Sequence, residues 1–260
     1  GRAGADAMAR QRAFGIHAVR AALGHGRERV SRLLYDPERA DRRLRQLLEA
    51  ARAIGVRPEP VDKARLDQLC GGGNHQGVLV EGDAPASGDE QGLDELLDAI
   101  PHVPLLLVLD GVTDPHNLGA CLRSADGAGA DAVIAPRDRA SGLTPTACKV
   151  ASGAAESVPF FQVTNLARSL RHLQDRHRVF VVGLAGEAQT GLYAADLTGP
   201  VALVCGAEGR GLRRLTRDTC DQLVRLPMAG QVDSLNVAVA AGVCLYEAVR
   251  QRAGVDGSAS

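Results

Sequence analysis

The stretch Leu226-Pro-Met-Ala-Gly-Gln-Val-Asp-Ser-Leu-Asn236 joins a short apolar segment to the long apolar segment near the end of the chain. The pattern predicts a strand ending at Leu226, a loop through Gly230, and a helix that Ser234 opens and that runs to about residue 252. The long loop, with Ser and Asn side chains at the mouth of the helix, has two interpretations. It is either an irregular approach to a capped helix or one wall of a binding site.

The composition is that of a globular protein and excludes several classes. Of the 260 residues, 45% are hydrophobic and 23% are charged, which supports one large or two modest domains. The sequence has no signal-peptide pattern and no apolar run long enough to cross a membrane, so we expect a cytoplasmic protein. With no Trp, three Tyr and four Phe, a stacking platform for single-stranded nucleic acid is not expected.

The six cysteines form no C-x-x-C pair and no Cys/His spacing typical of zinc sites. We therefore expect buried, reduced thiols, with neither a disulfide framework nor a metal site. The charge is uneven along the chain. Residues 1–83 carry 15 basic and 11 acidic side chains, whereas residues 84–260 carry 15 and 20. This imbalance favours contact between the first part and a polyanion, although ordinary surface variation also accounts for it.

Residues 13–83 are predicted to form a small α/β domain, which follows a loose leader over residues 1–12. The patterns predict helices over 16–23, 38–54 and 63–69, and strands over 30–35, 57–61 and 77–81. Arginines on the helix over 38–54 fit either a solvated face or contact with RNA. The Pro-, Gly- and Ser-rich residues 84–92 are expected to be a linker, and residues 253–260 a loose tail.

Residues 93–252 alternate short apolar segments with helical ones, which predicts a mostly parallel sheet covered by helices on both faces. The expected strands are 105–109, 132–135, 158–163, 179–184, 201–205 and 222–226. The expected helices are 118–128, 144–155, 165–177, 211–220 and 234–252. Ligands of such sheets bind beyond the carboxyl ends of the strands, so the loops at that edge are the candidate site.

Two further loops follow predicted strands. In Asp110-Gly-Val-Thr-Asp-Pro-His-Asn-Leu-Gly-Ala-Cys-Leu-Arg123, Asn117 is suited to cap the next helix and Arg123 lies beyond its first turn. In Cys205-Gly-Ala-Glu-Gly-Arg-Gly211, glycines surround the carboxylate of Glu208, and backbone N–H groups there can cradle a polar ligand. This order of glycines is not the G-x-G-x-x-G of dinucleotide folds, which disfavours a nicotinamide-dependent oxidoreductase.

Taken together, the three loops resemble the SpoU–TrmH family of RNA ribose 2′-O-methyltransferases, within the SPOUT superfamily. The resemblance rests on Asp114-Pro-His-Asn-Leu-Gly with Arg123, on Gly206-Ala-Glu-Gly-Arg-Gly-Leu, and on Leu226-Pro-Met with Ser234-Leu-Asn236. It implies S-adenosylmethionine as the methyl donor, a homodimer, and a C-terminal trefoil knot, which general rules of topology would not predict. Phe14-Gly-Ile-His-Ala-Val and Asn74-His-Gln-Gly-Val resemble the substrate-binding domain of many members, which implies an RNA partner.

The resemblance also implies roles for individual residues. Gly206, Leu226 and Leu235 would line the cofactor site, and Arg123 would activate the ribose 2′-hydroxyl. The residues expected to organise the pocket are Asn117, Glu208, Ser234 and Asn236. Because guanidinium groups stay protonated in proteins, we expect Arg123 to clamp phosphate and stabilise negative charge rather than to accept a proton. Glu208 either anchors its loop, which we favour, or contacts the substrate.

The branch of the family that the chain resembles most methylates a guanosine in 23S rRNA. Methylation of tRNA and a catalytically silent RNA-binding protein on the same scaffold are the alternatives. A silent binder would have no chemical reason to keep the polar residues of all three loops, which favours the enzyme.

Overall fold

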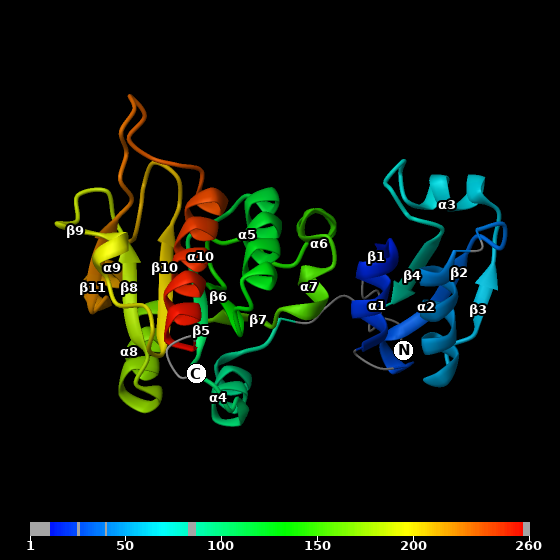
Figure 1. The fold of residues 1–260 in the computed structure, drawn as a ribbon, viewed down its shortest axis with the longest axis horizontal. Coiled ribbons are helices and arrows are strands. Elements are labelled where there is room, and N and C mark those ends of the chain that lie inside the picture. The colour runs from blue at the N-terminus through cyan, green and yellow to red at the C-terminus, as the bar shows by residue number, and fades with distance from the viewer. Residues whose placement is uncertain (1–10, 25–26, 40, 83–86, 257–260) are drawn as a thin grey trace, which may run out of the picture. The chain divides into compact units, whose positions relative to one another are not determined.

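The computed structural model describes residues 11–24, 27–39, 41–82 and 87–256, and it divides into two units (Figure 1). The first unit comprises residues 1–86 with 152–157, and the second comprises residues 87–151 with 158–260. Among the described residues, no helix combines the length and the apolar character that a membrane span requires.

The first unit is built on a four-stranded sheet with the order β1-β4-β2-β3. Its strands are β1 (Gln11–Phe14), β2 (Val30–Tyr35), β3 (Pro58–Pro60) and β4 (Val78–Gly82), and its main helices are α1 (Ile16–Gly24), α2 (Arg42–Ala53) and α3 (Lys63–Leu69). Strand β4 is antiparallel to both neighbours, and β2 is parallel to β3. Leu33 packs in the core formed with α1 and α2, whereas Leu34 packs with Leu66 of α3, because successive side chains of a strand point to opposite faces.

Two boundaries in this unit differ from the prediction. Helix α2 begins at Arg42 rather than at residue 38, because the carboxylate of Asp41 accepts a hydrogen bond from the backbone N–H of Leu44 (3.0 Å) and so caps the helix. Strand β1 had not been predicted; it begins at Gln11, inside the leader predicted over residues 1–12, where it pairs with Gly82. The rest of that leader lies outside the described residues.

The predicted linker over residues 84–92 contains ordered structure of the second unit. Gly88 pairs with Phe161 in a parallel bridge, and helix α4 (Glu90–Ala99) follows at once. The side chain of Asp89 caps α4 by accepting a hydrogen bond from the N–H of Gly92 (3.0 Å). The abundance of Gly, Pro and Ser therefore extended the predicted linker too far, because Asp89 is a helix cap rather than part of a loose connection.

The second unit is built on a seven-stranded parallel sheet with the order β7-β6-β5-β10-β8-β11-β9. Its strands are β5 (Leu105–Asp110), β6 (Ala132–Pro136), β7 (Phe160–Val163), β8 (Phe180–Leu184), β9 (Thr190–Gly191), β10 (Val201–Gly206) and β11 (Gln222–Arg225). The α/β class and the parallel sheet are confirmed. The short strand β9 and helix α4 had not been predicted.

Helices cover both faces of this sheet (Figure 1). Alternate residues of the central strands, such as Ala202 and Val204, join a core with α4 and α8 (Leu166–His177). On the opposite face α5 (Pro115–Gly127) and α10 (Val237–Asp256) pack together, and Cys205 of β10 meets Cys244 of α10. The hydrogen bond with Cys244 and burial raise the pKa of the Cys205 thiol, in accord with the expectation of inert, reduced cysteines.

Several helix limits in the second half also differ from the prediction. The single helix expected over residues 144–155 is two, α6 (Pro145–Ala151) and α7 (Ala154–Ser157), because Ser152 and Gly153 both adopt positive φ. Helix α9 (Arg214–Thr219) is shorter than expected. Helix α10 extends to Asp256, so the tail predicted from residue 253 begins inside a helix, and residues 257–260 lie outside the described part. The trefoil knot stays a prediction.

Candidate active site

A cavity of about 590 Å³ lies where strands β8, β10 and β11 end. Its walls come from three segments: the end of β8, the glycine-rich loop after β10, and the stretch from β11 into α10. The residues that line it are Leu184, Ala185, Gly186, Glu187, Cys205, Gly206, Ala207, Glu208, Gly209, Arg210, Gly211, Leu212, Arg217, Leu226, Met228, Asp233, Ser234, Leu235, Val237 and Ala240. The structure therefore places a pocket at the carboxyl edge that the strand pattern indicated.

The glycine-rich loop folds back over the end of β10. The N–H of Gly211 donates to the carbonyl of Ala207 (2.8 Å), and both Gly209 and Gly211 have positive φ. A Cβ on Gly206 would lie 2.2 Å from the backbone of Gly211, so only glycine permits this close return of the chain. The expected lining residue Gly206 thus has a steric role that its position in the pocket alone does not reveal.

A buried carboxylate that the sequence analysis did not single out fixes this loop. Asp110, the last residue of β5, has a completely buried side chain. Its two carboxylate oxygens accept hydrogen bonds from the backbone N–H (2.8 Å) and the Nε–H (2.6 Å) of Arg213, where α9 begins. A charged residue closing a fully apolar strand was the available signal, since a buried charge requires a partner.

Asn236, not Ser234, caps helix α10. The Oδ1 of Asn236 accepts hydrogen bonds from the N–H groups of Ala238 (2.9 Å) and Val239 (3.4 Å), and the helix begins at Val237. The prediction that Ser234 opens the helix was therefore wrong. Both residue types suit a cap, and the sequence alone did not decide between two positions so close together.

The amide of Asn236 also joins the three loops. Its Nδ2 donates to Oδ1 of Asn117 (3.0 Å) and to Oε1 of Glu208 (2.6 Å). The same Glu208 oxygen accepts the N–H of Val237 (3.3 Å). The carboxylate thus lies at the first turn of α10, where the positive end of the helix dipole favours negative charge. Both partners of Glu208 lie in the stretch from Leu226 to Val237 and not in the glycine-rich loop that carries Glu208. The carboxylate therefore links two loops.

Asn117 does not cap its helix. Asp114 caps α5 instead, by accepting a hydrogen bond from the N–H of His116 (2.9 Å), and Pro115 is the first helical residue. Asn117 therefore lies in the first turn, where its side chain is available for Asn236. The prediction of Asn117 as the cap was wrong because Pro115, which has no N–H to be satisfied, starts the helix earlier.

Of the remaining predicted site residues, three line the pocket and one does not. Leu226, Ser234 and Leu235 line the pocket, with Leu235 at 36% exposure, and the Ser234 hydroxyl contacts Asp233 at 3.4 Å. Arg123 is exposed on α5, does not line the pocket, and within the described part of the chain makes no hydrogen bond or ion pair. The structure thus groups most of the expected site and leaves Arg123 outside it.

A second cavity, of about 480 Å³, lies within the first unit, beside the loop over residues 71–77. Its lining includes two cations, Arg39 and Lys63, and the buried His75. Nε2 of His75 contacts the carboxylate of Asp67 (2.9 Å), and Nδ1 of the same ring accepts the N–H of Gly77 (3.0 Å). The imidazole therefore holds the glycine loop in shape, while Arg39 pairs with Asp41 and Lys63 pairs with Asp67.

The fold and the principal pocket define an α/β protein that binds a small ligand beyond the carboxyl ends of a parallel sheet. Residues 104–246 match the SpoU rRNA Methylase family, and residues 12–87 match a domain described as RNA 2′-O ribose methyltransferase substrate binding. The chain belongs to the SpoU rRNA methylase family.

Proteins from Ralstonia nicotianae and Haemophilus influenzae resemble the chain over nearly its whole length. It is 59% identical to the 23S rRNA (guanosine-2′-O-)-methyltransferase RlmB of Ralstonia nicotianae over 239 residues, which cover 92% of this chain and 95% of that protein. It is 55% identical to the protein of the same name from Haemophilus influenzae over 241 residues, which cover 93% and 98%.

Solved structures of two methyltransferases superpose on the chain over most of its length. The SpoU methyltransferase AviRb of Streptomyces viridochromogenes, in complex with the cofactor AdoMet, superposes with a TM-score of 0.75 at 29% identity, covering 94% of this chain and 90% of that chain. The AdoMet-bound rRNA methyltransferase of Sinorhizobium meliloti superposes with a TM-score of 0.73 at 27% identity, covering 93% and 87%.

Proposed function

We propose that this protein transfers a methyl group from S-adenosylmethionine to the ribose 2′-hydroxyl of a guanosine in 23S rRNA. The observation that carries the proposal is the joining of three separate loops by Asn117, Glu208 and Asn236 beside a ligand-sized pocket. The 59% identity to an RlmB protein supports the same reaction and the same RNA. A protein that only bound RNA would need neither this pocket nor the polar network beside it.

The pocket fits S-adenosylmethionine in size and chemistry. Its volume of about 590 Å³ falls in the range of small-molecule sites, roughly 300–1,000 Å³. The glycine-rich wall around Gly206 and Gly211 presents backbone groups that recognise a nucleoside without ordering long side chains. Leu226, Met228 and Leu235 supply apolar surface for the flat faces of the ligand. We propose Gly206, Leu226 and Leu235 as cofactor-binding residues on this basis.

When bound, S-adenosylmethionine supplies an electrophilic methyl carbon to which the ribose oxygen bonds as the carbon–sulfur bond breaks and the hydroxyl proton is lost. We propose that Asn117, Glu208 and Asn236 act by holding the three loops in one geometry. Fixed loops matter because correct positioning of reactants contributes as much as about 7–11 kcal/mol to a barrier. Ser234, with its hydroxyl at the pocket wall, is proposed to orient the incoming ribose.

Arg123 is proposed to act on the RNA rather than on the cofactor pocket. Its guanidinium is exposed on α5 and lies outside the pocket, as is required of a side chain that meets a large substrate from solution. A planar guanidinium binds phosphate through two parallel hydrogen bonds and stabilises negative charge that develops nearby. The ribose proton then passes to phosphate or to water.

The first unit is proposed to bind the RNA. The side chains of Arg42, Arg43 and Arg45 of α2 are exposed and, within the described part of the chain, make no hydrogen bond or ion pair. Folded RNA is recognised mainly through its backbone and shape, for which a row of free cations is suited. The match of residues 12–87 to a substrate-binding domain supports the same role.

A homodimer is also proposed. Val239 and Tyr246 of α10 are 52% and 53% exposed, and their spacing of seven residues places them on one face of the helix. Large apolar side chains exposed together are typical of surfaces that pack against a partner. Light scattering of wild type and Val239→Glu tests this: the variant is expected to be a monomer, whereas an exposed control, Val103→Glu, is expected to remain dimeric. A monomeric wild type would contradict the proposal.

The decisive experiment maps ribose methylation in total RNA from cells with and without the protein. Loss of one guanosine mark in 23S rRNA, restored by the wild-type chain and not by Asn236→Ala, is the expected result. Loss of a tRNA mark instead would replace the substrate. An unchanged methylation pattern would favour a silent RNA-binding protein. Because rRNA is methylated where ribosomes are assembled, the proposal also places the protein in the cytoplasm.

A further inference from the structure

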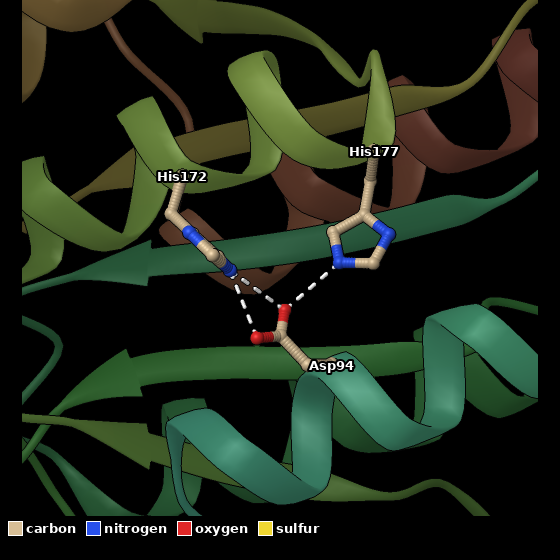
Figure 2. Close-up of side chains that lie close together, drawn as sticks. All are labelled: Asp94, His172 and His177. Atoms are coloured by element: carbon tan, nitrogen blue, oxygen red, sulfur yellow. Dashed lines mark hydrogen bonds and ion pairs between the residues drawn. The ribbon is translucent and has the colours of Figure 1, made fainter.

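Two imidazoles converge on one carboxylate at a place remote from the pocket (Figure 2). Nε2 of His172 lies 2.9 Å and 2.8 Å from the two carboxylate oxygens of Asp94, and Nε2 of His177 lies 2.8 Å from one of them. These ligand atoms all lie within 4.8 Å of one another. In the described parts of the chain, no other three His, Cys, Asp or Glu residues gather in this way.

The packing of two helices produces this arrangement. Leu93 and Leu97 of α4 pack in the same core as Leu170 and Leu173 of α8, which fixes the two helices on one face of the sheet. Asp94 follows Leu93 and therefore lies at the edge of that contact. The three polar side chains consequently owe their positions to a buried apolar interface rather than to their own attraction.

The C-terminal half of α8 supplies both imidazoles. His177 is its final residue, and Arg178 then adopts positive φ (55°) and ends the helix. Only 8% of the His177 side chain is exposed, against 50% of His172 and 26% of Asp94. The cluster is thus buried on one side and open to solvent on the other, so an ion and a water ligand can enter from the side of His172.

We propose that Asp94, His172 and His177 bind a zinc-class divalent metal ion, with water completing its coordination. Two neutral imidazoles and one carboxylate are a donor set that Zn²⁺ and its neighbours in the first transition row accept readily. In a tetrahedral zinc site the ligand atoms lie about 3.3 Å apart, as follows from metal–ligand distances of about 2.0–2.2 Å. The nitrogen–oxygen contacts of 2.8 and 2.9 Å would open by about 0.5 Å to reach this spacing, and all the ligand atoms already lie within 4.8 Å of one another.

A second carboxylate lies on the other side of the His177 ring. Its second nitrogen, Nδ1, faces Oδ1 of Asp98 at 3.8 Å, and Arg176 holds the other oxygen of Asp98 through Nη2 at 2.6 Å. A carboxylate behind a ligating imidazole fixes its tautomer and raises its basicity. At 3.8 Å the contact is longer than a hydrogen bond, so Asp98 would have to approach Nδ1 to act in this way, whereas Nε2 of His177 already faces Asp94.

The site is distinct from the proposed cofactor pocket. His177 precedes β8, which begins at Phe180, and Asp94 precedes β5, which begins at Leu105. Both lie toward the amino ends of these strands, whereas the pocket lies at the carboxyl ends. The ion would accordingly fasten α4 to α8 and take no part in methyl transfer.

The same chain offers a matched comparison. His102 Nε2 contacts Asp131 Oδ1 at 2.6 Å, which is an exposed His–Asp pair without a second imidazole. If the Asp94 cluster were only a hydrogen-bonded clamp between helices, neither pair would bind metal. If it is a metal site, only loss of a residue of the cluster abolishes binding.

The test uses the full-length protein after removal of its purification tag and dialysis against a chelator. Co²⁺ is titrated and followed by its visible absorption, Zn²⁺ is used to displace it, and thermal unfolding is recorded with and without Zn²⁺. The variants are His172→Ala and Asp94→Asn, with His102→Ala as the control. His172 is half exposed, so its truncation leaves the core intact.

The wild type and His102→Ala are expected to bind one ion per chain, to show the bands of tetrahedral Co²⁺, and to unfold at a higher temperature with Zn²⁺. Loss of a residue that only supports a metal ligand costs about 10–100-fold in affinity. His172 and Asp94 are ligands themselves, so His172→Ala and Asp94→Asn should bind the ion at least about 100-fold more weakly than wild type. Absence of saturable binding in the wild type would overturn the proposal, as would equal binding by wild type and His172→Ala.

Discussion

Replacement of Asp110 by Asn tests whether the glycine-rich loop is held by a single buried charge. The carboxylate accepts two hydrogen bonds from Arg213, at 2.6 Å and 2.8 Å, and its side chain is inaccessible to solvent. An amide of the same shape turns an NH₂ group toward one of these donors and removes the charge opposite the guanidinium. The change in side-chain volume is small, so the effect reports on the hydrogen bonds.

Hydrogen bonds to a charged group contribute about 1.5–3 kcal/mol each. Arg213 is 37% exposed, so its guanidinium can regain water when the carboxylate is lost, which reduces the total. We therefore expect Asp110→Asn to lower the free energy of unfolding by about 2–3 kcal/mol. In a domain of this size that corresponds to a fall in Tm of about 4–12 °C.

The assay pairs thermal unfolding with titration of S-adenosylmethionine. Because Arg213 closes the loop that lines the pocket, Asp110→Asn should also weaken cofactor binding by at least about tenfold, or 1.4 kcal/mol. The control is Asp218→Asn, which makes the same chemical change in the exposed Arg214–Asp218 pair and should cost less than about 0.5 kcal/mol. A variant at Asp110 as stable as the control, or one that binds the cofactor as wild type does, would refute the reasoning.

Four further predictions follow from particular contacts. Glu208→Gln replaces a charge-assisted hydrogen bond by a neutral one, so S-adenosylmethionine should bind about fivefold more weakly in calorimetric titration, a loss of about 1 kcal/mol. Arg123→Lys should lower kcat at least about tenfold, because an ammonium cannot reproduce the planar fork; activity like that of wild type with an unchanged pH–rate profile would exclude a bidentate clamp. Burial raises the pKa of Cys121 to about 12, so mass spectrometry should find this thiol unalkylated after iodoacetamide treatment of the folded protein at pH 8. Hydrogen bonding by Arg250 lowers the pKa of Glu247 below 4.5; the stabilisation is complete above that pH and is lost as pH falls through the lower folded value, so Tm of Glu247→Gln should fall less than that of wild type on acidification from pH 5 to pH 3.

The two cavities differ in what they offer to partners. The pocket at the carboxyl edge of the second sheet is lined by backbone and apolar groups and suits a compact nucleoside. The cavity beside His75 is polar, and its charged lining consists of Arg39 and Lys63 together with the carboxylates of Asp36, Glu38 and Asp67, so it does not favour an anion. Salt dependence separates RNA binding from cofactor binding, because phosphate contacts release counterions and cofactor contacts do not.

Much of the second sheet was predictable because each of its central strands is short, continuously apolar and flanked by helical periodicity. Such strands are buried on both faces, so their composition alone identifies them. Helix ends were less predictable. Asp41, Asp114 and Asn236 cap helices in the structure, but several residues near each end could have served as well.

The sequence by itself determined the family, the parallel α/β class and the three loops that hold the proposed site, because these depend on local patterns and on motifs in a given order. Only the tertiary structure decided which side chains meet. Asn236 bonds both Glu208 and Asn117, and Asn117 lies more than a hundred residues away in the sequence. Asp110 bonds Arg213 over a similar sequence separation. The meeting of Asp94 of α4 with His172 and His177 of α8 has the same origin. Long-range pairs are set by how helices and strands pack on the common sheet, which no local pattern records.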